Sequence, residues 1–246
     1  MVDTRFDFGV TRVTPKQFEK QVRIALEHGF AVQTLSDYMN GGPHNKRRTA
    51  ITFDDGYESV YTYAFPILRH YGLTATVFVN TGYCGKRNTW DVNLGGLTFP
   101  HLSWEQIREL DKAGWEIGSH TVNHMDLTCI PPKAARRELS ESRRALKKQV
   151  THVSPFVSYP FGNTNAGVIE LCKQVGYSGG TVMGLGSEEL EPDYAIPRIG
   201  VYLLDNKWTF TSKLYGRNMH LFYGIQGFLN KCSNGTVFVK KWSWKF

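Results

Sequence analysis

The chain has 246 residues, of which 41% are hydrophobic and 21% are charged, and its formal net charge is +7. This composition excludes an intrinsically disordered chain, because such chains combine few apolar residues with a high net charge. The length is enough for one substantial hydrophobic core, so we expect a single domain over residues 1–246.

The chain has no apolar run of about 18 residues, the length that a membrane-spanning helix requires. Residues 1–8 lack the basic, apolar and small-residue order of a secretory signal. We therefore expect a soluble protein without a transmembrane segment. It would be cytoplasmic as given, and extracytoplasmic if a leader has been removed.

Helices and strands alternate through the first third of the chain. Thr14 and Pro15 open a helix with apolar residues at helical spacing, and Gly29 ends it. A short apolar run over 30–32 and a loop lead to a buried strand over 49–53. A helical stretch that begins after Gly56 and runs to Tyr71, and a strand over 75–79, follow.

The alternation continues through the rest of the chain. A loop over 81–100 precedes a helix in which Ser103 and Gln106 have capping-box spacing and which ends at Gly114. Later elements are a strand over 115–118, helices over 133–149 and 165–175, and strands over 156–159, 177–182 and 196–201. Beyond Leu204 the pattern is weaker. A closing helix would use Trp208, Phe210, Leu214, Leu221, Phe222 and Phe228, and an edge strand would cover 238–246.

Strands that alternate with helices predict a parallel sheet covered by helices. The pattern is compatible with either a barrel or an open, doubly wound sheet. No linker separates a second domain.

The first chemical motif is residues 52–56 (TFDDG), with two carboxylates at the C-terminal end of a buried strand. In parallel α/β folds this end of the strands carries the active site. Two adjacent buried carboxylates are costly unless a cation or hydrogen bonds compensate. A metal ligand beside a separately held acid is one solution, and a helix cap with an exposed neighbour is the structural alternative.

The second motif is residues 120–124 (HTVNH), directly after the strand over 115–118. The i, i+4 spacing brings His120 and His124 to one side of a turn. Two imidazoles and one carboxylate suit a first-row divalent metal and leave positions open for water and substrate. Two unrelated loop histidines are the alternative, which a nearby Asp-Asp pair makes weaker.

These two motifs resemble the first two motifs of the polysaccharide deacetylase family, carbohydrate esterase family 4. The resemblance extends over about residues 14–200, and residues 205–246 form a C-terminal extension. It implies a single domain with a distorted (β/α) barrel of about seven parallel strands. It also implies that Asp54 is the general base and that Asp55, His120 and His124 bind a divalent metal, most often zinc, with cobalt, nickel and manganese as alternatives.

A third segment, residues 159–162 (YPFG), is similar to the family motif that ends in Pro-Tyr-Gly. The resemblance implies that the Phe161 backbone N–H stabilises an oxyanion and that Tyr159 and Pro160 contact substrate. Ser158 stands where many members have an arginine that positions the base. Arg198 is the best remaining candidate for that role, and an unrelated surface arginine is the alternative.

The late Leu-x-His motif, whose histidine is the general acid in the family, has no counterpart in that form. His220 is the one histidine in the last third of the chain and is a weak candidate for the acid. The predicted function is removal of N-acetyl groups from an N-acetylglucosamine-containing polysaccharide or surface-glycan precursor. An O-acetyl esterase acting on xylan-like glycans and a non-catalytic glycan-binding relative are the alternatives.

Seven of the basic residues lie between Lys133 and Lys148, in one predicted helix. A solvated helix face explains this cluster, and attraction to an anionic polymer is the alternative. No nucleic-acid recognition motif accompanies it, so we expect an acetylated glycan as partner and no nucleic acid.

Overall fold

The computed structural model describes residues 1–4, 12–41, 47–89, 98–184 and 189–224. Within them, every strand runs parallel to its neighbours. A two-stranded sheet pairs β1 (Phe30–Gln33) with β2 (Arg47–Ala50). The second sheet contains six strands in chain order, β3 (Thr52–Phe53), β4 (Thr76–Val79), β5 (Glu116–Ser119), β6 (Val153–Ser158), β7 (Gly179–Met183) and β8 (Ile196–Arg198).

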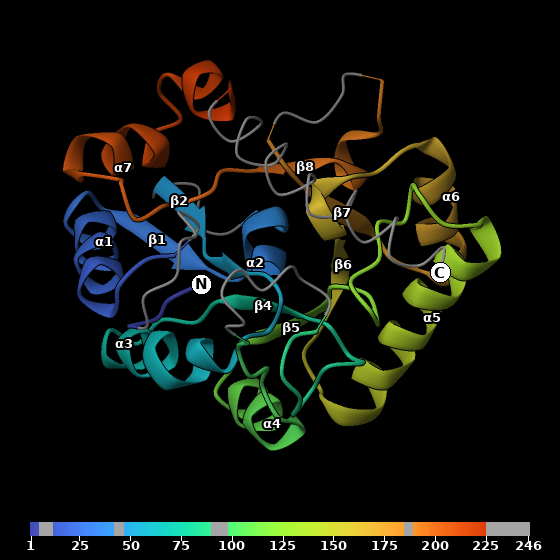
Figure 1. The fold of residues 1–246 in the computed structure, drawn as a ribbon. Coiled ribbons are helices and arrows are strands. Elements are labelled where there is room, and N and C mark those ends of the chain that lie inside the picture. Colours follow the sequence, from blue (N-terminus) through green and yellow to red (C-terminus); the bar gives the residue numbers. More distant parts are fainter. Residues whose placement is uncertain (5–11, 42–46, 90–97, 185–188, 225–246) are drawn as a thin grey trace.

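Ile51 joins the two sheets. Its N–H donates to Gln33 O at 3.4 Å, and its carbonyl accepts from Thr76 N at 3.0 Å. β2 and β3 are therefore one bent strand whose two halves have different partners, and the described strands number seven when it is counted once. The strands curl into a barrel-like arc with helices on its outer side (Figure 1), which confirms the predicted (β/α) barrel class.

Helices connect successive strands, as the alternation predicts. The α-helices are α1 (Pro15–Glu27), α2 (Leu35–Met39), α3 (Phe65–His70), α4 (Trp104–Lys112), α5 (Pro132–Gln149), α6 (Ala166–Val175) and α7 (Lys207–Leu214). A π-helical turn over Val60–Ala64 precedes α3, and 3₁₀ turns cover Pro160–Gly162 and Pro192–Tyr194. The predicted caps form: Thr14 Oγ1 accepts from Gln17 N at 3.3 Å, and Ser103 and Gln106 make a reciprocal capping box.

The hydrophobic core has two outer parts, each between strands and the helices outside them. One is centred on Trp115, whose ring stacks on Phe53 at 5.8 Å and meets the edge of Phe65 at 5.9 Å. The other packs α5 and α6 against β6 and β7, with Leu139 and Cys172 fully buried. These layers fix the strand ends, and so they fix the position of any site built there.

A third cluster lies where the strands curl around α2 (Figure 1). Leu35 of α2 packs there against Phe78, Phe156 and Ile196, which come from three alternate strands of the second sheet. The start of α2 is held by Glu116, whose carboxylate accepts from Ser36 N at 3.1 Å and from Thr76 Oγ1 at 2.6 Å. α2 was not predicted from the sequence.

The end of the described chain agrees in part with the prediction. α7 is the predicted closing helix and lies beside α1 (Figure 1), with Gln17 Nε2 donating to the carbonyls of Leu203 and Asp205 at 3.1 and 3.0 Å. Trp208 and Leu221 were expected in this packing but are 61% and 58% exposed. Phe228 and the strand over 238–246 lie outside the described residues. Within the described ranges, no helix has both the length and the apolar composition to cross a membrane.

Candidate metal and catalytic site

The residues of the predicted site gather at the C-terminal ends of four strands. Asp54 and Asp55 directly follow β3, and His120 directly follows β5. Ser158 ends β6 and Arg198 ends β8. Because all these strands are parallel, their carboxyl ends lie at one edge of the sheet, which is the usual place for a site in such folds.

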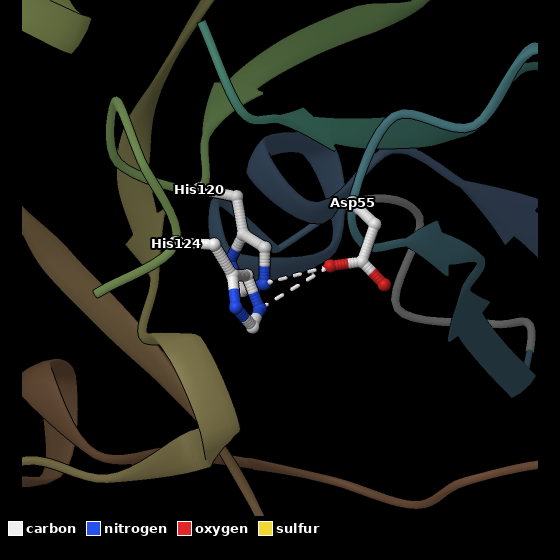
Figure 2. Close-up of side chains that lie close together, drawn as sticks. All are labelled: Asp55, His120 and His124. Carbon is white, nitrogen blue, oxygen red and sulfur yellow. Dashed lines mark ion pairs between the residues drawn. The ribbon is translucent and has the colours of Figure 1, made fainter. Parts of the chain in front are cut away.

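Asp55, His120 and His124 converge on one point (Figure 2). Asp55 Oδ1 lies 3.4 Å from His120 Nε2 and 3.3 Å from His124 Nε2. Oδ1 is buried and has no hydrogen-bond donor among the described residues. The two imidazoles are almost fully buried, at 3% and 8% exposure, so water does not solvate the cluster freely.

This cluster fits a divalent metal ion. Two ligand atoms that are each about 2.0–2.1 Å from a tetrahedral zinc ion are about 3.3 Å apart. The measured separations of the Asp55 oxygen from the two ring nitrogens agree with that value. One carboxylate and two imidazoles are borderline ligands that suit zinc and its first-row neighbours.

The backbone adopts costly conformations to present these side chains. Asp55, Thr121 and His124 have φ values of 69°, 67° and 55°, in the left-handed region that non-glycine residues avoid. Such residues cost about 1–3 kcal/mol each and persist only where the surroundings impose them. Gly56 extends the turn with φ +65° and passes so close to Val79 that a Cβ would lie 2.8 Å from its Cγ1.

The surroundings of His120 fix its ring orientation. Its Nδ1 lies 2.8 Å from Ser158 O, so the N–H at Nδ1 donates to that carbonyl. The other ring nitrogen, Nε2, faces Asp55. Burial acts to lower the pKa of His120, but the adjacent carboxylates and the Ser158 carbonyl raise it overall. Burial lowers the pKa of His124 to about 3, which keeps that imidazole neutral, the form that binds metals.

Asp54 makes a different set of contacts from its neighbour. Arg198 Nη1 and Nη2 donate to its two oxygens at 2.9 and 2.7 Å, and Ser158 Oγ donates to Oδ1 at 3.0 Å. Arg198 also donates to Thr52 Oγ1 at 3.0 Å, which anchors the guanidinium to β3. Burial alone raises the pKa of Asp54, but Arg198, His120 and Ser158 outweigh burial and hold that pKa far below its ordinary value of 3.8.

Arg198 therefore contacts Asp54 as the sequence analysis expected, and Ser158 adds a contact that it missed. From the sequence, Ser158 was expected only to replace an arginine. Ser158 stands near the carboxyl end of a predicted strand, as the other site residues do, and this position could have identified it.

Within the segment over 159–162, one residue lies at the site and two are buried. Phe161 adopts φ 61°, and its ring packs edge-on against His124 at 4.7 Å. Tyr159, predicted to contact substrate, is instead 1% exposed and covers Gly180 in the second core part. Pro160 is buried as well. The structure therefore brings Phe161 to the site and places the Tyr159 ring in the core.

Of two further histidines, His101 lies beside the site, whereas His220 lies on the exposed surface. His220 is exposed in the segment after α7. His101, which the sequence analysis did not consider, is 3% exposed and stacks on Tyr57 at 5.0 Å, beside the turn that carries the two aspartates. Burial lowers its pKa although the charge of Asp55 acts to raise it. His101 therefore belongs to the electrostatic environment of the cluster.

Comparison with known proteins identifies the family. The model of the polysaccharide deacetylase family matches residues 41–180, more than half of the chain, and this range contains all three metal-site candidates and Asp54. The chain belongs to the polysaccharide deacetylase family. The predicted membership in this family of hydrolases is confirmed.

Curated relatives extend the match beyond that range. YxkH of Bacillus subtilis (strain 168) is 27% identical over 195 residues, which are 77% of this chain and 66% of that protein. A poly-beta-1,6-N-acetyl-D-glucosamine N-deacetylase of Staphylococcus aureus (strain MSSA476) is 29% identical over 202 residues, 76% of this chain and 67% of that protein. The chain thus spans about two thirds of the length of these relatives.

Solved structures share the fold at lower identity. The deacetylase PplD of Streptococcus pyogenes has a TM-score of 0.73 and 22% identity, covering 87% of this chain and 94% of that one. IcaB of Ammonifex degensii has a TM-score of 0.69 and 21% identity, covering 85% and 91%. At these identities the likeness establishes the barrel fold.

Proposed function

We propose that this chain is a metal-dependent hydrolase that removes N-acetyl groups from a polysaccharide containing N-acetylglucosamine. Asp55, His120 and His124 would hold the metal, with zinc as the first candidate. The named activity of the Staphylococcus aureus relative supports a poly-N-acetylglucosamine or a related surface glycan as the substrate class.

The main observation behind the proposal is that two adjacent carboxylates, Asp54 and Asp55, have different surroundings. Asp55 faces two imidazoles with an oxygen that no protein donor satisfies, whereas Asp54 is fully engaged by Arg198 and Ser158. A glycan-binding relative would need no ionised, oriented carboxylate beside a metal cluster. Hydrolysis needs one, to take a proton from water.

Each residue then has a defined part in the reaction. A bound metal would polarise the acetyl carbonyl and lower the pKa of a water molecule. Asp54 would accept the proton of the attacking water, since Arg198 keeps it ionised at neutral pH. The Phe161 backbone N–H would donate to the oxyanion that develops on the former carbonyl. Collapse of the tetrahedral species breaks the carbon–nitrogen bond, and the proton that Asp54 accepted would pass to the departing nitrogen, so that acetate is released and an amine is left on the sugar.

The direct test measures acetate release from N-acetylglucosamine oligomers. The protein is stripped with a chelator, assayed, and assayed again after zinc or cobalt is added. We expect no release from the stripped protein and recovery with metal, while Asp54→Asn stays inactive with metal bound. Absence of release from every acetylated glycan in the wild-type protein would overturn the proposal in favour of a binding protein.

Acetylated xylan serves as a second substrate in the same assay. An N-deacetylase produces free amines on the sugar, whereas an O-acetyl esterase produces hydroxyls. Amine formation with N-acetylglucosamine oligomers, together with slower release from acetylxylan, is the expected result. The reverse preference would assign the site to the esterase reaction.

A further inference from the structure

The loop that carries the two histidines is held by a carboxylate from a neighbouring helix. Glu138 of α5 is 9% exposed, and its Oε2 accepts from the backbone N–H groups of Val122 and Asn123 at 2.9 and 2.8 Å. Its Oε1 accepts from Asn123 Nδ2 at 2.7 Å. One side chain therefore satisfies three donors between His120 and His124.

A second contact from α5 braces the start of the same loop. Ser142, one helical turn beyond Glu138, lies 2.7 Å from Ser119 through their hydroxyl oxygens. Ser119 Oγ in turn accepts from Thr121 N at 3.1 Å. Both serines are almost fully buried, so these contacts are shielded from water.

The segment after β4 holds the opposite side of the loop. Thr81 N and Gly82 N donate to the carbonyls of Thr121 and Val122 at 3.1 and 2.9 Å. Gly82 allows this approach, because a Cβ there would lie 2.7 Å from Val122 O. The loop is therefore clamped between α5 and the segment that follows β4.

The clamp explains how the unfavourable backbone of the loop persists. Thr121 and His124 have positive φ, and loops relax from such conformations unless their surroundings impose them. A buried carboxylate that accepts three N–H groups supplies this constraint, and its removal would leave buried donors unsatisfied. The loop would then relax, and the distance between His120 Nε2 and His124 Nε2 would change.

We propose that Glu138 is a positioning residue of the metal site, which holds the 120–124 loop in its metal-binding shape before any metal arrives. The inference rests on the proposed function, because it assumes that Asp55, His120 and His124 bind metal. Glu138 is not one of the three grouped metal-ligand candidates. It acts through the backbone of Val122 and Asn123.

The test compares Glu138→Ala with Glu141→Ala on the same helix. Glu141 pairs with Arg137 at the protein surface and contacts no part of the loop, so its variant controls for the loss of an acidic residue in α5. Zinc affinity is measured by competition with a chelating dye. We expect a loss of about 10- to 100-fold for Glu138→Ala, the range seen for outer-shell partners of metal ligands, and no change for Glu141→Ala.

Glu138→Gln supplies a readout that general destabilisation would not produce. The Gln oxygen accepts both backbone N–H groups, and rotation of the Asn123 amide by half a turn lets its oxygen accept from the Gln amide. Zinc affinity should therefore return to within a few-fold of the wild-type value. Equal loss in the Ala and Gln variants would contradict the positioning role.

Gly82→Ala perturbs the loop from its other side and leaves α5 intact. If Glu138→Ala fails to fold, the inference depends on this variant, which should also bind zinc more weakly than wild type. Wild-type affinity in Gly82→Ala or in folded Glu138→Ala would overturn the inference. Failure of the wild-type protein to bind zinc, cobalt, nickel or manganese would instead overturn the proposed metal site.

Discussion

Arg198 and Asp54 form a two-pronged ion pair although 144 positions separate them in the chain. Arg198 ends β8, the last strand of the six-stranded sheet, and Asp54 follows β3, the first. The ion pair therefore crosses from one end of the curled sheet to the other. A planar guanidinium matches both carboxylate oxygens at once, which a lysine ammonium does not.

Replacing Arg198 with lysine should lower turnover with little change in metal content. The charge remains, but one of the two hydrogen bonds is lost and the carboxylate of Asp54 can rotate. We expect kcat to fall by roughly 10- to 100-fold, as for small misplacements of catalytic groups. Arg137→Lys in the exposed pair with Glu141 is the control, and its kcat should match wild type. Wild-type kcat in Arg198→Lys would show that two-pronged geometry is not required.

Asp54 and His120 should separate catalysis from metal binding. Asp54→Asn should reduce kcat by about 100- to 10,000-fold, the range for loss of a general base, and should keep its metal. His120→Ala should lose both, because it removes one of three ligands. Activity assays and elemental analysis of the purified variants measure the two properties. Substantial turnover in Asp54→Asn would remove the base assignment.

Gly56 and Gly72 offer a matched pair of substitutions, since both have φ +65°. A Cβ at Gly56 would lie 2.8–3.1 Å from Val79 atoms, whereas at Gly72 nothing lies within 4 Å. Gly72→Ala should cost only backbone strain, about 1 kcal/mol. Gly56→Ala should add about 1–3 kcal/mol from overpacking. Denaturant unfolding of the two variants measures the difference, and equal losses would contradict it.

Asp111 should make stability depend on pH. This buried side chain of α4 accepts from Thr151 N at 2.9 Å and His152 N at 2.7 Å. Burial raises the pKa of Asp111, but these hydrogen bonds and the His152 side chain lower it overall below 3.8. A lowered folded-state pKa contributes stability that is complete above the unfolded-state value and is lost as the pH falls through the folded-state value.

Asp111→Asn should therefore be less stable than wild type at pH 7, by about 1–3 kcal/mol, because its amide nitrogen faces one of the two backbone donors with N–H groups and leaves that donor unsatisfied. The difference should narrow as the pH falls below about 4, near the ordinary aspartate pKa. Denaturant unfolding from pH 7 down to the lowest pH at which both proteins fold measures it. A constant difference over that range would contradict the role of the ionised carboxylate.

The sequence predicted the features that depend on neighbouring residues or on a repeating pattern. The capping box of Ser103 and Gln106 is local, and the alternation of strands and helices required a parallel sheet. Parallel strands then forced Asp55 and His120 toward one edge, because each follows its strand directly. Those residues could be placed without knowing the order of strands.

Contacts between distant elements were beyond the sequence pattern. Nothing local indicates that Glu138 faces the 120–124 loop, since an acidic residue in a basic helix usually marks a solvated face. The burial of Tyr159 was missed because a tyrosine at a strand end is compatible with either a site or a core. α2 has only five residues, too few for a helical period to be recognised.

The cluster of Leu35, Phe78, Phe156 and Ile196 has a consequence for how a polymer engages this protein. It fills the space inside the curve of the described strands with apolar side chains, so a sugar chain does not thread between them. Under the proposed function, a long glycan would instead lie across the carboxyl ends of the strands. Deacetylation at an internal position of the polymer would then require no free chain terminus.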